Sequence, residues 1–235
     1  MLRVKRIGLS DKTVDQVAPL LEKAVQGWAD INPRSLEYAQ ALTMLGMVRQ
    51  FFADVDIHAL RDNVEPLYKK AIAVYDRSIV PPSPADVALT LELEAGVLNG
   101  IGEVQEATFL SERAITIRKG RVREIQEGAQ RIATAFKPGE GISAPTIATR
   151  SDPAYTNEAR FLRVQGSVGL HFVVDENGRP QDISLVHSLG FGLDENAAMA
   201  LRNWRFNPGK DESGKTLPTL VNMDIDFKLE AARKP

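Results

Sequence analysis

The 235-residue sequence contains no cysteine and only three histidines. The absence of cysteine excludes disulfides, thiolate metal sites, iron–sulfur clusters and a cysteine nucleophile. His171 and His187 lie in predicted strands and can be drawn with Asp182 as a metal site, but no further ligand stands at motif spacing. We therefore expect no metal and no cofactor.

The sequence also lacks a long apolar run and an excess of one charge. No stretch of about 18 apolar residues occurs, so we expect no membrane span. Residues 1–8 include basic side chains without an apolar segment behind them, so we do not expect them to act as a signal peptide. This predicts either a cytosolic protein or a fragment whose membrane-targeting part was removed. The net charge of −2 predicts no nucleic-acid partner.

Local charge runs and loops add no catalytic signal. The basic run from Arg118 to Arg123 is balanced by Glu124 and Glu127, which is typical of a solvated helix face. Gly190-Phe-Gly192 lacks the third glycine and the lysine of a phosphate-binding loop. Ser188 is not in a nucleophile elbow. We therefore expect no catalytic residues and a non-enzymatic protein.

The first 135 residues have helical periodicity. Apolar residues recur three and four positions apart, as one face of a helix requires. Prolines and glycines separate the periodic segments. The predicted helices cover residues 11–29, 35–53, 60–79, 84–98 and 104–135.

These helices contain a repeated sequence pattern. Similar seven-residue segments surround Ala24, Ala71 and Ala114, which are 47 and 43 residues apart. Such a period predicts stacked helical hairpins. The small residues Ala95, Ala107 and Ala114, separated by 12 and 7 positions, resemble those of tetratricopeptide repeats. Two interpretations stay open: a concave surface that binds a peptide or protein, or a helical spacer that only packs.

From Gly166 onward the period changes to two, as in half-buried strands. Asn177-Gly178 predicts a tight hairpin between the first two strands. A helix with an apolar stripe follows, and Asp194 is predicted as its N-cap or first-turn acid. The predicted strands cover residues 166–174, 181–188 and 219–229.

The two periodicities predict an α+β protein of two domains. Residues 1–135 are predicted as an all-α, tetratricopeptide-like array of helical hairpins. Residues 136–148 are rich in glycine and proline and are predicted as an extended linker. Residues 149–235 are predicted as a three-stranded antiparallel sheet with one helix, in the order β-β-α-β.

Four motifs stand in order in the second domain. They are Asp152-Pro-Ala-Tyr155, Asp175-Glu-Asn-Gly-Arg179, Gly192-Leu-Asp-Glu-Asn-Ala197 and Trp204-Arg205-Phe206 with Pro208. Over about residues 141–229 they resemble the carboxy-terminal domain of the TonB family. Physically, Tyr155, Trp204 and Phe206 are typical of core residues, and Pro208 prevents the helix from resuming.

The resemblance implies a periplasmic, protein-binding module. Family members are usually tethered to the inner membrane and linked to a proton-driven motor there. Their domain binds a short peptide of an outer-membrane transporter by strand addition, and main-chain groups supply most of the affinity. Here the resemblance assigns that edge to Thr219, Leu220, Val221, Asn222, Met223, Asp224 and Ile225. It also implies a partner contact at Asp152, where family members carry a polar amide.

The sequence departs from the family in one large respect. The helical array stands where the family has a membrane helix and a proline-rich stretch. A second hypothesis is therefore an adaptor whose repeats bind the client and whose free sheet edge forms a homodimer. Asp224 and Asp226 on one face of that strand are typical of an edge protected against unwanted pairing.

Overall fold

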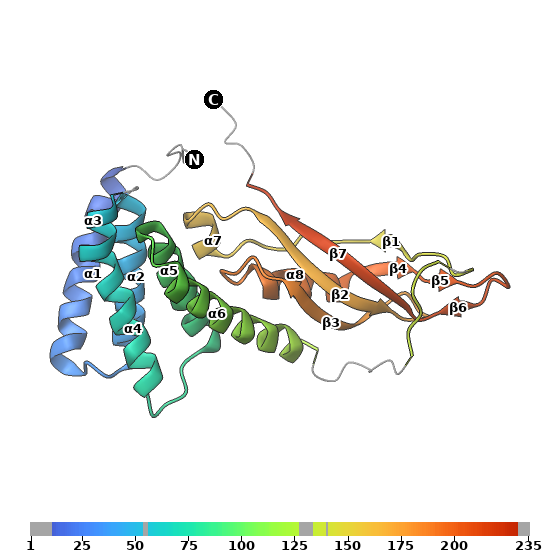
Figure 1. Ribbon diagram of the computed structural model, residues 1–235, viewed down its shortest axis with the longest axis horizontal. Coiled ribbons are helices and arrows are strands. Elements are labelled where there is room, and N and C mark those ends of the chain that lie inside the picture. Colours follow the sequence, from blue (N-terminus) through green and yellow to red (C-terminus); the bar gives the residue numbers. More distant parts are fainter. Residues whose placement is uncertain (1–10, 54–55, 127–133, 140, 230–235) are drawn as a thin grey trace. The chain divides into compact units, whose positions relative to one another are not determined.

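The computed structural model describes residues 11–53, 56–126, 134–139 and 141–229. The chain divides into two compact units, one ending at Ala114 and the other running from Ile115 to Leu229. Figure 1 labels their helices and strands. Within the described residues, every helix is too short or too polar to cross a lipid bilayer.

The first unit is helical, as predicted. The predicted helix over 60–79 begins with a π-helical turn, and the predicted helix over 104–135 ends at Glu124. A turn follows there, closed by the N–H of Gln126 donating to the carbonyl of Arg123 at 3.1 Å; the helix predicted over residues 127–133 lies outside the described residues. The elements are α1 (Asp11–Ile31), α2 (Leu36–Ala53), α3 (Ile57–Ala59), η1 (Leu60–Val64), α4 (Glu65–Arg77), α5 (Pro84–Ile101) and the first half of α6 (Val104–Glu124), which continues into the second unit.

Close approach of helices holds this unit together. A Cβ atom on Gly46 of α2 would lie 2.5 Å from Cε1 of Tyr68 on α4, so only glycine allows this spacing. The Tyr68 hydroxyl donates to Oε1 of Gln50 at 2.8 Å. The hydroxyls of Thr43 and Thr90 meet at 2.9 Å and join α2 to α5. Helix α2 therefore packs against α4 and α5 through small and hydrogen-bonded residues.

One buried group in this unit is electrostatically unfavourable. Glu94 on α5 is fully buried, and neither of its carboxyl oxygens has a hydrogen-bond partner among the described residues. The pKa of Glu94 is raised to about 8, chiefly by burial and also by the nearby carboxylates of Glu65 and Glu106, while Lys69 opposes the shift. The carboxyl group is therefore held in its protonated form near neutral pH.

The second unit contains the predicted three-stranded antiparallel sheet. Its strands are β2 (Gly166–Val174), β3 (Pro180–His187) and β7 (Thr219–Phe227), arranged in the order β3-β2-β7. Helix α8 (Leu193–Asn203) packs on one face of the sheet (Figure 1). The predicted β-β-α-β order is confirmed, with the sheet's second strand beginning one residue early, at Pro180.

Short elements surround this sheet. β1 (Thr146–Thr149) pairs with β4 (Arg205–Asn207), and β5 (Gly209–Lys210) pairs with β6 (Thr216–Leu217). Helix α7 (Asn157–Phe161) is capped by the Thr156 hydroxyl, which accepts from the N–H of Ala159 at 3.2 Å. β1 lies within residues 136–148 and just beyond, the segment that the sequence predicts as a linker.

The core of this unit lies between α8 and the sheet. The predicted helix stripe is buried, and so are alternate residues of β2 and β7. The indole N–H of Trp204 donates to the carbonyl of Ser151 at 2.9 Å, and the ring centroid of Phe206 lies 5.5 Å from that of Phe172. The buried residues are Leu193, Ala197, Leu201 and Trp204 of the stripe, Val168, Leu170, Phe172 and Val174 of β2, and Ile225 and Phe227 of β7.

Candidate partner-binding edge

Strand β7 lies at the border of the sheet. It pairs with β2 over nine positions, from Gly166 opposite Phe227 to Val174 opposite Thr219. Among the described residues, no strand of the sheet pairs with its other side. β7 therefore has the geometry that strand addition requires.

The hydrogen bonds of Phe136 show which main-chain groups of β7 point outward. The N–H of Leu220 donates to the carbonyl of Phe136, and the N–H of Phe136 donates to the carbonyl of Pro218, both at 2.8 Å. Alternate residues of a strand direct their N–H and C=O groups to the same side. Asn222 and Asp224 therefore present theirs outward, as Leu220 does.

Phe136 also shortens the available edge. It forms a parallel bridge with Thr219, so the chain itself covers the start of β7. Of the residues assigned to the edge by resemblance, Thr219 and Leu220 lie under this bridge, whereas Val221 to Ile225 lie beyond it. We name residues 222–226 the open edge.

Side chains of β7 are engaged on the two faces of the sheet. Val221, Met223, Ile225 and Phe227 pack into or against the core. On the other face, Oδ1 of Asn222 lies 2.7 Å from Nδ1 of His171, and the Ser167 hydroxyl donates to Asp226 at 2.7 Å. Hydrogen bonds from Lys228 and then Ser167 lower the pKa of Asp226. What the open edge offers a partner is thus chiefly its main chain.

The motif residues take separate places. The Tyr155 hydroxyl donates to the carbonyl of Val164 at 3.1 Å, and its ring packs edge-on against Phe227 at 5.4 Å. Trp204 and Phe206 are buried, whereas Arg205 and Asp152 are exposed and Pro208 is half-buried. Trp204 and Phe206 thus belong to the core, and Tyr155 packs against the end of β7.

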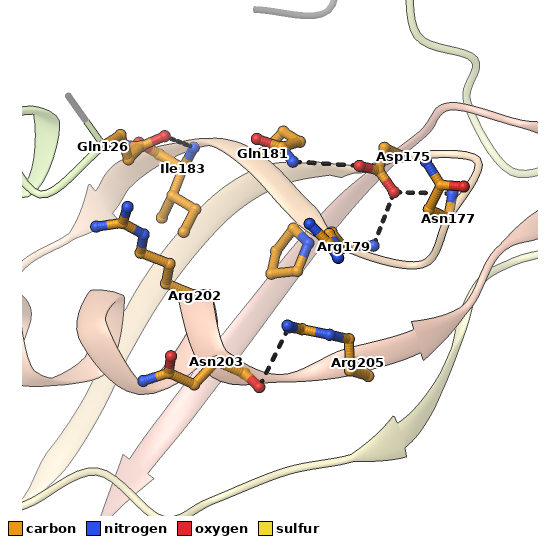
Figure 2. A pocket seen from close by; sticks show the side chains of 10 residues that line it. Gln126, Asp175, Asn177, Arg179, Gln181, Ile183, Arg202, Asn203 and Arg205 are labelled. Atoms are coloured by element: carbon orange, nitrogen blue, oxygen red, sulfur yellow. Dashed lines mark hydrogen bonds between the residues drawn. The ribbon is translucent and has the colours of Figure 1, made fainter. Parts of the chain in front are cut away.

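The opposite border of the sheet is capped at one residue, Ile183 of β3. The Ile183 N–H of β3 donates to Oε1 of Gln126 at 2.5 Å, and Nε2 of Gln126 donates back to the Ile183 carbonyl. Figure 2 shows the Gln126 side chain against Ile183. Its amide occupies the place that a peptide unit of a fourth strand would take. Nothing in the sequence pattern indicated this cap, because Gln126 lies inside a predicted helix.

We expect Gln126→Ala to expose the edge of β3. The loss of two hydrogen bonds, each worth about 1 kcal/mol net, should accelerate amide exchange at Ile183 by about tenfold or more. Hydrogen-exchange mass spectrometry or NMR measures this rate. Gln126→Glu keeps the acceptor and loses the donor, so its rate should be intermediate. An unchanged rate in the alanine variant would contradict the cap.

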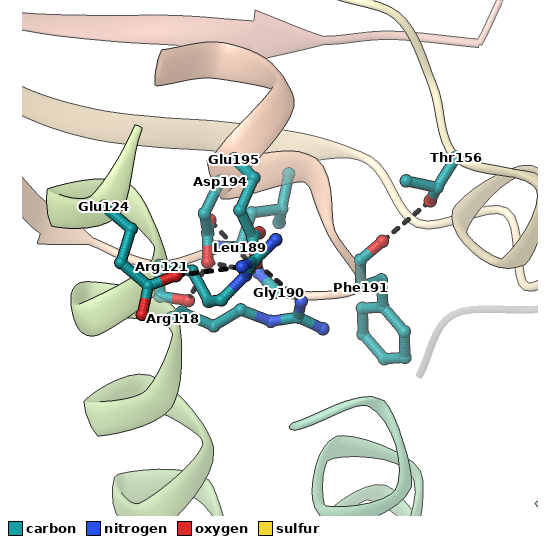
Figure 3. A network of polar contacts seen from close by, with 10 residues as sticks. Arg118, Arg121, Glu124, Thr156, Leu189, Gly190, Phe191, Asp194 and Glu195 are labelled. Atoms are coloured by element: carbon teal, nitrogen blue, oxygen red, sulfur yellow. Dashed lines mark hydrogen bonds and ion pairs between the residues drawn. The ribbon is translucent and has the colours of Figure 1, made fainter. Parts of the chain in front are cut away.

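The loop before α8 is organised by Asp194. The N-cap position itself is taken by Gly192, and Asp194 lies in the first turn. Its buried carboxylate accepts from the N–H groups of Leu189 at 2.8 Å and Gly190 at 3.3 Å, and from the Ser188 hydroxyl at 2.6 Å (Figure 3). Burial raises the pKa of Asp194, and these hydrogen bonds oppose the shift. The carboxylate stabilises a loop whose three residues 190–192 all have positive φ.

A buried ion pair lies beside this loop. Nη1 of Arg118 is 3.0 Å from Oε1 of Glu195, and the Arg118 side chain is 2% exposed (Figure 3). The prediction of a solvated basic face is therefore wrong at Arg118, although Arg121 pairs with Glu124 at the surface. Residues that end α6 thus belong to the core of the second unit. No cluster of candidate metal ligands occurs among the described residues.

The carboxy-terminal part of the chain is similar in sequence to known proteins. Residues 151–229 match the family model "Gram-negative bacterial TonB protein C-terminal". Protein TonB of Klebsiella aerogenes is 30% identical over 92 residues, which are 39% of this chain and 35% of the relative. Protein TonB of Escherichia coli K12 is 32% identical over 88 residues, 37% of this chain and 34% of the relative.

The matched part is about a third of the length of these relatives. A solution NMR structure of the Pseudomonas aeruginosa TonB CTD is 25% identical, with a TM-score of 0.33, covering 40% of this chain and 93% of that chain. The order of the four sequence motifs and the family match coincide in the same segment. Residues 151–229 are therefore a carboxy-terminal domain of the TonB family.

Proposed function

We propose that the TonB-family domain binds an extended peptide of an outer-membrane transporter along the open edge of β7. Family membership supports a protein-binding, energy-transducing role without catalysis. The observation that carries the proposal is the outward main chain of Asn222 and Asp224 beside β2. Gln126 caps the opposite edge at Ile183, which supports β7 as the strand that the peptide extends.

We propose that the protein performs this function in the periplasm, where it transmits energy for transport. In this proposal the full-length protein is anchored to the inner membrane and coupled to motor proteins there. The helical unit, with its tetratricopeptide-like spacing, serves as an interaction or spacer domain. Residues 136–148 join the two domains, and Asp152 adds a polar contact to the partner.

Proline at position 222 tests the edge directly. Asn222→Pro removes an outward N–H and places a ring on the open edge, while the inward hydrogen bonds of β7 remain because edge strands tolerate proline. We expect affinity for synthetic peptides copied from transporter amino-terminal segments to fall at least about tenfold. Fluorescence anisotropy with labelled peptides and the full chain measures it.

Asn222→Ala is the matched control. It loses the side-chain contact to His171 and keeps every main-chain group, so binding should persist. Equal binding by the proline variant would contradict pairing on β7, and so would the absence of binding to folded wild-type protein. Sedimentation analysis distinguishes the adaptor hypothesis from peptide binding. A tight homodimer that Asn222→Pro dissociates would assign the open edge to pairing between two copies of the chain.

A further inference from the structure

A polar pocket lies between the turn end of the β2–β3 hairpin and the junction of α8 with β4. Its volume is about 470 Å³, and three of its lining residues are Arg179, Arg202 and Arg205. Figure 2 shows Arg179 and Arg205 reaching into the same space from two different elements. We name it the arginine pocket.

The arginine pocket has an excess of positive charge. Among the described residues that line it, only Asp175 is acidic, and its Oδ1 already accepts from the N–H groups of Asn177 at 2.9 Å and Arg179 at 2.8 Å. Its other oxygen accepts from Nε2 of Gln181 at 3.2 Å. This carboxylate is therefore occupied by the hairpin turn, and it does not pair with the guanidinium groups.

The three arginines find no carboxylate elsewhere among the described residues. Nη1 of Arg205 donates to the carbonyl of Trp204 and Nη1 of Arg202 to that of Ile125, both at 2.6 Å. The Arg179 guanidinium has no hydrogen bond or ion pair in the described part of the chain. By contrast, Arg118 and Arg121 of the same unit form ion pairs. Most N–H donors around the pocket are thus open to an anionic ligand.

We propose that the arginine pocket binds side-chain carboxylates of an acidic peptide segment. Guanidinium groups match carboxylates with paired, charge-assisted hydrogen bonds. The amides of Asn177 and Gln181 in the lining add acceptor oxygens, which a peptide N–H can use and a fully ionised phosphate group cannot. Because the pocket is on the β3 side of the sheet, this contact is separate from the open edge of β7.

The test compares two labelled peptides on the full chain at low ionic strength. One alternates glutamate with alanine, and the other has glutamine in place of glutamate. We expect only the glutamate peptide to bind and the glutamine peptide not to. Arg179→Gln should weaken the affinity for the glutamate peptide about tenfold. Arg179 is exposed, and its guanidinium is unpaired within the described ranges, so the variant should keep the wild-type circular dichroism spectrum. Arg150→Gln removes the same charge from another exposed position of this unit and should bind like the wild type.

Competition by small anions shows whether the pocket prefers a peptide. Citrate, a free carboxylate, should compete only weakly, since it lacks the peptide main chain. Asn222→Pro should leave acidic-peptide binding unchanged, which keeps this site distinct from the proposed transporter contact. Equal binding of the two peptides, an unaffected Arg179→Gln variant, or stronger binding of pyrophosphate than of the acidic peptide would each overturn the proposal.

Discussion

Gly178→Ala should destabilise the TonB-family domain more than any other single methyl group added to its turns. Gly178 ends the tight turn of the β2–β3 hairpin with φ of 76°, which disfavours side chains. An added Cβ would also overlap the carbonyl oxygen of Phe206, a backbone atom that cannot rotate away. The Gly178 carbonyl meanwhile accepts from the N–H of Phe206 at 2.9 Å. Strain and overlap together should cost about 2–5 kcal/mol.

Gly214 supplies the matched control. Its φ is 85°, and an added Cβ there meets no atom within 4 Å. Gly214→Ala should therefore cost only the conformational term, about 1–2 kcal/mol. Urea denaturation of both variants, followed by circular dichroism, gives the difference in the free energy of unfolding. Equal losses would show that the contact between the hairpin and β4 is not rigid.

Glu94→Gln should make the helical unit more stable at and above pH 8. The folded-state pKa of Glu94 is about 8, against an ordinary value of 4.5, because burial disfavours its charged form. A raised carboxyl pKa means that the folded state holds a proton that the unfolded state releases. Stability from this group is therefore full below about pH 4.5, falls as the pH rises to about 8, and stays low above it.

The neutral glutamine has no proton to lose, so its variant should not show this fall. We expect a gain of a few kcal/mol over the wild type at pH 8, shrinking toward zero near pH 4.5. Urea denaturation at several pH values measures it, taking the wild-type minus variant difference to cancel other titrations. Glu103→Gln, an exposed change of equal charge, should leave the pH dependence as in the wild type. A flat difference for Glu94→Gln would contradict the raised pKa.

Periodicity was enough to predict the elements that build the core. The stripe through Leu193, Ala197 and Leu201 and the alternation in β2 and β7 follow from burying one face of a helix or strand. The π-helical turn at 60–64 has no such signature, since its apolar pattern matches that of an ordinary helix. Helix existence was therefore easier to predict than helix ends.

The features that select the candidate site have no periodic signature. Phe136 binds β7 with its main chain, which any residue supplies, so the segment 136–148 is indistinguishable in sequence from a free linker. Gln126 caps β3 from a position far away in sequence. Arg118 is buried where it forms an ion pair with Glu195, which is also distant in sequence. Contacts of this kind depend on tertiary packing and cannot be derived from local composition.

The pairing of β7 with β2 also determines how the sheet carries a mechanical load. The two strands stay in antiparallel register over nine positions without a bulge, whereas the β2–β3 pair contains two register shifts. A pull directed along β7 loads all hydrogen bonds of an even ladder at once, while an uneven ladder concentrates the strain at its bulges. The strand that carries the open edge is thus the one whose own attachment resists shear most uniformly.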